Sequence, residues 1–172
     1  LVLARADAGV ETPEADLVDL RQALDDAIKD VQPQVARQGV RLDRQQPDAQ
    51  WFVGGTHESI RRLALIVLDN AVKYSPVGAT VRILVADDDA TGGPAIAIEV
   101  IDAGPGIPAA ERQRVFDRFY RGAGARQSTP DGSGLGLSIA HTIVERLGGS
   151  ITIDDVPDGP GCRVRVRLPR VA

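Results

Sequence analysis

Side chains able to hold a phosphorylated ligand occur in four short parts of this chain. Asn70 and Lys73 are three residues apart in a helical pattern, so both face the same side of that helix. Asp102 follows an apolar run and precedes two glycines, and three alternating glycines precede a second helical pattern. An amide, an ammonium group, a carboxylate and flexible glycine loops are suited to hold a nucleotide and a divalent cation.

Asp102 is the candidate for recognising the base. It ends the apolar run 96–101 and precedes Gly104 and Gly106, whose lack of side chains lets a ligand approach the backbone. A carboxylate there accepts a hydrogen bond from the exocyclic amino group of adenine and would face another acceptor in guanine. The alternative is an Asx turn that only ends a strand.

Asn70 and Lys73 are the candidates for the phosphate end of the site. A neutral amide oxygen can ligate Mg²⁺ and leave the ion enough charge for phosphate oxygens, and an ammonium group can meet a phosphate directly. Tyr74 can pack against the nucleotide or close the helix. Taken alone, the asparagine and lysine could also be a solvated pair near a helix C-terminus.

Gly132, Gly134 and Gly136 form the third candidate group. They alternate directly before a helical pattern, where free N–H groups and the helix dipole attract anions. In isolation such glycines can be a simple turn. The residues before them, 121–133, have no periodicity and predict a mobile loop that closes over the phosphates.

Two aromatic residues and two arginines stand at the start of this loop. We expect Phe116 and Phe119 to anchor the loop in the core. Arg118 and Arg121 are expected either to project toward the loop or to be solvated.

Composition limits the class of protein. The 172 residues, 43% of them apolar, fit one globular domain, and the net charge of −4 disfavours a nucleic-acid partner. A single cysteine, Cys162, excludes an internal disulfide and is expected to be a small apolar strand residue. No apolar run reaches the roughly 20 residues of a membrane span. The missing initial methionine predicts a fragment of a longer protein.

Apolar spacing predicts about three main helices against one mixed sheet, a two-layer α/β sandwich. Thr56 is the expected N-cap of the helix that carries Asn70, with Ser59 as its capping-box partner. The arginines of the last strand are expected to form its solvated face. The strands are expected near 16–20, 40–43, 51–53, 81–86, 96–101, 150–156 and 162–168, and the helices near 24–38, 56–74, 109–119 and 135–147.

The order of these segments resembles the N, G1, F and G2 boxes of the catalytic, ATP-binding domain of sensor histidine kinases. That domain belongs to a larger group with gyrase, Hsp90 and MutL, and the resemblance covers nearly the whole chain. The matching residues are Asp69-Asn70-Ala71-Val72-Lys73-Tyr74, Asp102-Ala103-Gly104-Pro105-Gly106, Phe116-Asp117-Arg118-Phe119-Tyr120 and Gly132-Ser133-Gly134-Leu135-Gly136-Leu137.

The resemblance implies a Bergerat ATP-binding fold, with ATP and Mg²⁺ as cofactors and Asn70 as the metal ligand. It implies that residues 1–10 are the tail of a dimerisation and phosphoacceptor helix, that 11–172 are the catalytic domain, and that about 120–134 form its ATP lid. Catalytic roles fall on Asn70, Lys73 and Arg118. The implied ATP-binding residues are Asn70, Lys73, Tyr74, Asp102, Gly104, Gly106, Ile107, Phe119, Gly132, Ser133, Gly134, Leu135, Gly136 and Leu137.

Position 66 separates the kinases from related ATPases. In the gyrase and Hsp90 branch, a glutamate one helical turn before the asparagine activates water, and here that residue is Ile66. Isoleucine cannot accept a proton, which favours a kinase. The alternatives are an ATPase clamp, a serine kinase acting on an anti-sigma antagonist, and a domain that binds nucleotide or a partner without catalysis.

The phosphate acceptor is not expected within this chain. Neither His57 nor His141 has the acidic, helical setting of the accepting histidine in these kinases. The resemblance therefore implies, as partners, a separate dimerisation domain of the same protein and a response regulator. The parent is expected to be a homodimer anchored in the bacterial membrane, with this domain in the cytoplasm and touching neither nucleic acid nor membrane.

Overall fold

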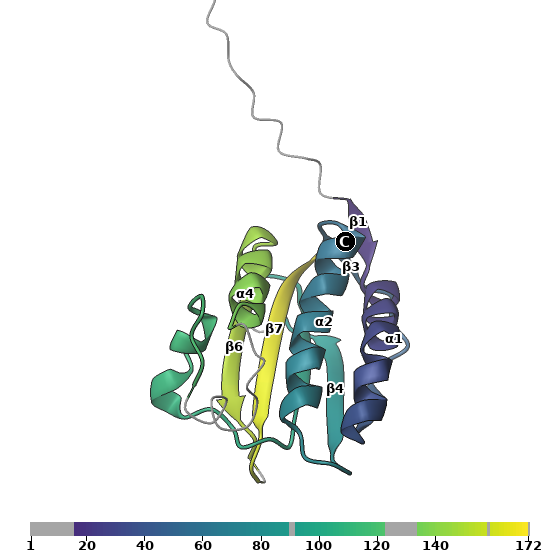
Figure 1. The fold of residues 1–172 in the computed structure, drawn as a ribbon. Helices are drawn as coiled ribbons and strands as arrows, with labels where there is room; N and C mark the ends of the chain where they lie inside the picture. The colour runs from purple at the N-terminus through teal and green to yellow at the C-terminus, as the bar shows by residue number, and fades with distance from the viewer. Residues whose placement is uncertain (1–15, 90–91, 123–133, 158, 172) are drawn as a thin grey trace, which may run out of the picture.

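The computed structural model describes residues 16–89, 92–122, 134–157 and 159–171. Within these residues, three α-helices lie over one face of a mixed seven-stranded sheet, so the predicted two-layer α/β sandwich is confirmed (Figure 1). The chain order of its regular elements is β1 (Leu17–Asp19), α1 (Leu20–Gln38), β2 (Arg41–Gln45), β3 (Phe52–Gly54), α2 (His57–Tyr74), β4 (Thr80–Asp87), β5 (Ala95–Ile101), η1 (Ala109–Glu111), η2 (Arg114–Phe116), α4 (Gly136–Arg146), β6 (Ser150–Asp155) and β7 (Cys162–Val171).

The long strand β7 organises the sheet. One edge of β7 pairs with β5 along its length, and the other edge pairs first with β6 and then, at Arg170 and Val171, with β3. The full order is β1-β3-β7-β5-β4-β2, with β6 beside β7. All pairs are antiparallel except β2 with β4. Both predicted hairpins, β4–β5 and β6–β7, are present.

Helix α1 begins and ends with matched caps. The Asp19 carboxylate accepts hydrogen bonds from the N–H groups of Arg21 and Gln22, and Gly39 closes the helix with a left-handed φ of 67°. Its apolar face packs on the sheet and on α2. The buried residues of that face are Leu20, Ala23, Leu24, Ala27, Val31 and Val35.

Helix α2 positions the asparagine and lysine. The predicted capping box is present, because Ser59 N donates to Thr56 Oγ1 at 3.1 Å and Thr56 N donates to Ser59 Oγ at 3.2 Å. The helix ends at Tyr74, before Ser75, and packs between α1 and α4. Seven apolar residues are buried along it: Ile60, Leu63, Ala64, Val67, Leu68, Ala71 and Val72.

The predicted helix at 109–119 is wrong. Two separate 3₁₀ turns, η1 and η2, take its place, with backbone bonds between residues three apart such as Asp117 N to Arg114 O at 2.9 Å. The bulky apolar residues here, Val115, Phe116 and Phe119, all lie in the last five positions, so the segment has no apolar stripe along its length that would hold an α-helix against a core.

The arginines of β7 are not simply solvated. Arg165 forms salt bridges with Glu99 on β5 at 3.2 Å and with Asp88 at 2.9 Å, and Arg167 Nε lies 3.3 Å from the same Asp88 carboxylate. These side chains therefore form a paired charge network on the sheet face away from the helices. The prediction failed because the carboxylates that pair with these arginines lie outside β7, and the alternation of β7 gives no information about them.

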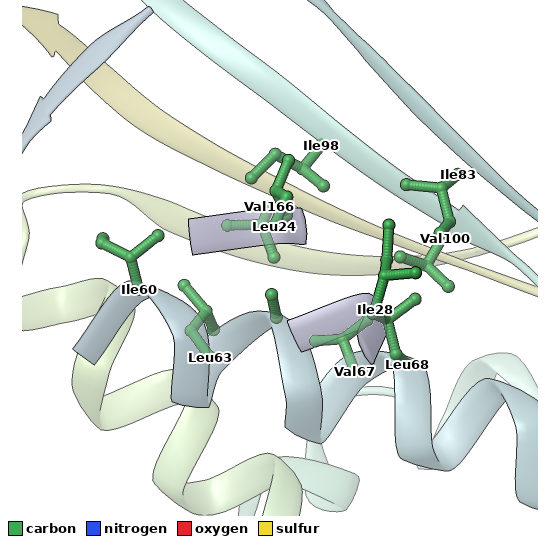
Figure 2. Close-up of a pocket in the computed structure, with 11 residues that line it drawn as sticks. Leu24, Ile28, Ile60, Leu63, Val67, Leu68, Ile83, Ile98, Val100 and Val166 are labelled. Carbon is green, nitrogen blue, oxygen red and sulfur yellow. The ribbon is translucent and has the colours of Figure 1, made fainter. Parts of the chain in front are cut away.

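The core fills the space between the helices and the sheet. Its only tryptophan, Trp51, is 1% exposed, and its Nε1–H donates to Asp87 Oδ1 at 2.9 Å. A small void between α1, α2 and the sheet has a volume of about 20 Å³, and Figure 2 shows the side chains around it. Its lining is entirely apolar: Leu24, Ile28, Ile60, Leu63, Ala64, Val67, Leu68, Ile83, Ile98, Val100 and Val166.

Within the described residues, no helix has the length and apolarity needed to cross a membrane.

Candidate nucleotide site

A cavity of about 320 Å³ opens between the end of α2, the loop after β5 and the start of α4. The strands β6 and β7 contribute Ile153, Cys162 and Val164 to its lining. It brings together predicted residues from three of the four motifs: Asn70, Lys73, Tyr74, Asp102, Gly106, Ile107, Gly134, Gly136 and Leu137.

Asp102 lines this cavity directly after β5. Its Oδ1 accepts hydrogen bonds from Gly104 N at 2.8 Å and from Cys162 N at 3.1 Å. Burial raises the pKa of Asp102 above its ordinary value, and these two N–H donors act in the opposite direction. The hydrogen bond from Gly104 N forms an Asx turn. Asp102 therefore ends the strand with this turn and also lines the cavity.

The loop after Asp102 is glycine-rich because backbone segments meet there. A Cβ on Gly104 would lie 2.8 Å from the carbonyl oxygen of Tyr74, so only glycine lets this loop lie against the end of α2. Gly104 is therefore a packing residue behind the site and does not line the cavity. Ile107 does line it, and its carbonyl accepts a bond from Arg112 Nε at 3.0 Å.

Asn70 and Lys73 lie on one wall, as the helical spacing predicts. Lys73 Nζ lies 5.8 Å from the centroid of the Tyr74 ring, a distance that permits a cation–π contact. Asn70 also borders a second hollow of about 310 Å³ between α1 and α2, together with Asp69 and Gly136. No group of three or more His, Cys, Asp or Glu side chains gathers to ligate a metal in the part of the chain that the structure describes.

The glycine loop is described only at its end. Gly134 and Gly136 line the cavity, and a Cβ on Gly136 would lie 3.4 Å from Ile66 Cγ2 and 3.9 Å from Asn70 Nδ2. Ile66 and Asn70, both on α2, therefore lie against the first residue of α4. Gly132, Ser133 and most of the predicted lid lie outside the described residues, as does the predicted helix tail 1–10. Leu135 precedes α4, where its carbonyl accepts from Ser138 Oγ at 2.8 Å.

The prediction that Phe119 anchors the loop in the core is wrong. Phe119 is 74% exposed and has a φ of 62°, and its N–H donates to Gly134 O at 3.0 Å. The left-handed backbone turns its side chain outward, so the contact to the glycine loop is made by the main chain. Phe116 is partly buried against the core, as expected. Arg118 is exposed and lies outside the cavity lining.

Sequence reasoning missed several lining residues. Asp69, one residue before Asn70, borders both hollows, and its carbonyl accepts from Gln34 Nε2 at 3.3 Å. Tyr120 and Arg121 border the cavity beyond Phe119. Three further lining residues are inward-facing strand residues. The alternation of a strand predicts that such residues are buried but not which cavity they line: Ile153, Cys162 and Val164. Burial raises the pKa of the Cys162 thiol to about 12, and the charge of Asp102 contributes.

The two histidines lie apart from the cavity lining. His57 Nε2 lies 3.0 Å from Asp26 Oδ2 and joins the first turn of α2 to α1. His141 stacks on the ring of Phe116, with 5.2 Å between centroids, and lies 3.5 Å from Glu145. Both therefore have local packing and pairing roles.

Comparisons with known proteins agree with this geometry. The family described as "Histidine kinase-, DNA gyrase B-, and HSP90-like ATPase" matches residues 55–172. The signal transduction histidine-protein kinase/phosphatase MprB of Mycolicibacterium smegmatis is 39% identical over 170 residues, and its Mycobacterium tuberculosis H37Rv counterpart is 38% identical over the same length. The match covers 97% of this chain but only 32% of either relative.

Solved structures show the same fold. The mycobacterial sensor histidine kinase MprB superposes with a TM-score of 0.77 and 31% identity, covering 91% of this chain and 97% of that one. The nucleotide-free catalytic domain of the histidine kinase ThkA gives 0.76 with 18% identity, covering 91% and 96%, a likeness of fold alone. The chain therefore belongs to the family of histidine kinase-, DNA gyrase B- and HSP90-like ATPases, as the ATP-binding catalytic domain of a sensor histidine kinase.

Proposed function

We propose that this domain binds Mg²⁺-ATP and transfers the γ-phosphoryl group to a histidine on a separate dimerisation domain of its parent protein. In the transfer, the bond between the γ-phosphorus and the β–γ bridging oxygen breaks, and ADP leaves with that oxygen. A ring nitrogen of the acceptor histidine forms the new bond to phosphorus. The domain contributes by positioning and by neutralising charge.

The observation that carries this proposal is the polarity of the cavity. A partly buried carboxylate, Asp102, lines the cavity directly after β5, while an amide and an ammonium group, Asn70 and Lys73, line the wall formed by α2. Adenine suits the carboxylate, and a triphosphate suits the amide and the ammonium group. The start of α4, with Gly134 and Gly136, adds free N–H groups and the positive end of a helix dipole near Asn70.

The residues present fit a magnesium ion bound together with the triphosphate. An amide oxygen from Asn70 is a hard, neutral ligand, and Mg²⁺ in such sites takes most of its ligands from phosphates and water. Asn70 would hold the ion, and Lys73 would meet a phosphate oxygen. The ion supplies charge neutralisation when it is bound.

Position 66 supports a kinase over a hydrolase. Ile66 lies beside Gly136 and one turn before Asn70, where it offers no group to activate water. The carboxylates that border the cavity within the described residues are Asp69 and Asp102. Asp102 accepts hydrogen bonds from the backbone and is assigned to adenine. Asp69 is therefore the remaining candidate for the general base if water were the phosphoryl acceptor.

The test is incubation of the domain with ATP labelled in the γ-phosphate, with and without the dimerisation domain of the parent. We expect little released phosphate and little bound label from the domain alone, and label on the added domain when both are present. Rapid phosphate release by the domain alone would favour an ATPase clamp, and its loss in Asp69→Asn would identify the base. Stable label on His57 or His141 would instead place the acceptor within this chain.

The parent protein is proposed to resemble its relatives in organisation. We propose that it is a membrane-anchored homodimer with this domain in the cytoplasm, and that a response regulator receives the phosphoryl group. The same labelling assay, extended by adding the candidate regulator, tests the second transfer. Label that remains on the dimerisation domain would contradict that pairing.

A further inference from the structure

The hairpin between β6 and β7 contacts the aspartate that lines the cavity. Asp102 N donates to Cys162 O at 2.9 Å, and Cys162 N donates back to Asp102 Oδ1 at 3.1 Å. Gly104 N donates to the same oxygen at 2.8 Å. Two donors on one oxygen fix the rotation of the carboxylate. The other oxygen, Oδ2, forms no hydrogen bond with any residue that the structure describes.

Gly161 is the residue that allows this close approach. A Cβ on Gly161 would overlap the carbonyl oxygen of Asp102 and would lie 3.1 Å from Val156 Cγ2. From the other side, a Cβ on Gly106 would lie 2.9 Å from the carbonyl oxygen of Gly161. The nearest opposing atom at 161 is backbone, which cannot rotate away. A side chain there must therefore move the start of β7 or the loop that begins at Asp102.

We propose that Gly161, together with the N–H group of Cys162, positions Asp102 so that Oδ2 meets the 6-amino group of adenine and sets the preference for 6-aminopurine nucleotides. This inference rests on the proposed binding of ATP. Both residues act through Asp102, so they are positioning residues. The contribution of Cys162 comes from its main chain, since its N–H is the group that donates.

The hairpin supplies a matched control for the experiment. Gly159 has a φ of 154° and Gly161 one of 142°, so alanine is strained at both positions. A Cβ on Gly159 meets nothing within 4 Å, whereas one on Gly161 meets Asp102. Comparing Gly161→Ala with Gly159→Ala therefore separates the displacement of Asp102 from the general cost of alanine in this turn.

The readout is the affinity of each variant for ATP and for purine riboside triphosphate, which lacks the 6-amino group, measured by calorimetry. We expect Gly161→Ala to lose about tenfold or more in affinity for ATP, the scale of one charge-assisted hydrogen bond. Its affinity for the 6-unsubstituted nucleotide should change about twofold or less. Gly159→Ala should bind both like the wild type.

The outcomes separate this inference from the proposed function. Equal binding of both nucleotides by the wild type would refute base recognition by Asp102 itself. A wild-type preference for ATP that survives in Gly161→Ala would refute only the positioning role. If Gly161→Ala does not fold, amide NMR of Asp102→Asn decides: the signals of Gly104 and Cys162 should both move upfield, because a neutral acceptor is weaker, and unmoved signals would overturn the inference.

Discussion

Asp102 combines two opposing requirements in one side chain. Its proposed role needs the charged form, while burial favours the neutral form and raises its pKa. The N–H groups of Gly104 and Cys162 offset part of that cost by donating to the carboxylate. The residue that we propose to recognise the base is therefore also one that makes the folded domain less stable at neutral pH.

We predict that Asp102→Asn weakens ATP binding about tenfold or more while leaving the free energy of unfolding at pH 7 unchanged or higher. The folded-state pKa of Asp102 lies above its unfolded value, so the wild type loses stability as pH rises through that interval. Asparagine keeps an oxygen for the two donors and carries no charge. Urea denaturation at pH 7 and near pH 3 checks this, and a variant clearly less stable at pH 7 would contradict it.

Asn70 offers a second prediction at this scale. We expect Asn70→Ala to keep the affinity for ATP in excess EDTA within about twofold and to lose the gain that Mg²⁺ gives the wild type, since the amide would act through the ion. Lys73→Ala is the contrasting variant, because an ammonium group that meets phosphate directly should matter with or without metal. Titration with a fluorescent ATP analogue measures both. A normal Mg²⁺ effect in Asn70→Ala would assign the ion to another ligand.

Single residues were predictable where their chemistry is local. Asn70, Lys73 and Asp102 line the cavity as expected, because helical spacing and the end of a strand fix their directions. Phe119 was misplaced, because a left-handed backbone at a non-glycine residue leaves no signal in apolar patterning. Cys162 was recognised as a strand residue, but its bond to Asp102 depends on a pairing between distant strands.

At the scale of elements, α2 contributes both to the core and to the proposed phosphate end of the site. Its first turn is fixed by Thr56 and Ser59, and its last turns present Asn70 and Lys73 to the cavity. Its buried face meets the sheet and both neighbouring helices. The capping groups and the proposed binding groups therefore lie at opposite ends of one helix.

We predict that Thr56→Ala lowers the free energy of unfolding by about 1 kcal/mol, the usual value of an N-cap side chain. The affinity for ATP should remain unchanged, because the cap lies at the end of α2 away from Asn70. Thermal unfolding and ATP titration of the same variant test both parts. Unchanged stability would mean that Ser59 and solvent satisfy the first turn without the threonine.

Elements with their own apolar face were predictable, and those without one were not. Helices α1 and α2 have buried residues three and four apart, which fixes their type and approximate ends. Residues 109–119 lack such a face, so local backbone bonds decide their shape and produce 3₁₀ turns. The strand β7 runs three residues beyond the predicted Leu168, because its pairing with β3 is a tertiary contact.

At the scale of the whole molecule, the helices and the sheet do not fill all of the space between them. The void of Figure 2 lies where α1 and α2 cross the sheet, and its apolar lining offers no hydrogen bonds to water. Empty volume removes dispersion contacts from the residues around it. The void also depends on segments far apart in the chain, so it is a property that no local pattern could predict.

We predict that Val67→Ile raises the free energy of unfolding by up to about 1 kcal/mol, because one added methylene fills part of this void. Val72 on the same helix is the matched control, since it is 0% exposed and does not line the void. Val72→Ile should destabilise the domain by about 1–3 kcal/mol through overpacking. Urea denaturation of both variants checks the pair, and similar losses in both would mean that the void cannot accept a methylene.

The burial of Trp51 also gives the domain an optical property. The indole of Trp51 is 1% exposed and hydrogen-bonded to Asp87, so a single buried environment sets the emission spectrum of the only tryptophan. Unfolding moves that indole into water. Trp51 does not line the nucleotide cavity, so ATP should leave the emission of the folded domain unchanged. Nucleotide should appear only as a shift of the unfolding midpoint, which makes this intrinsic fluorescence a label-free readout of ligand affinity.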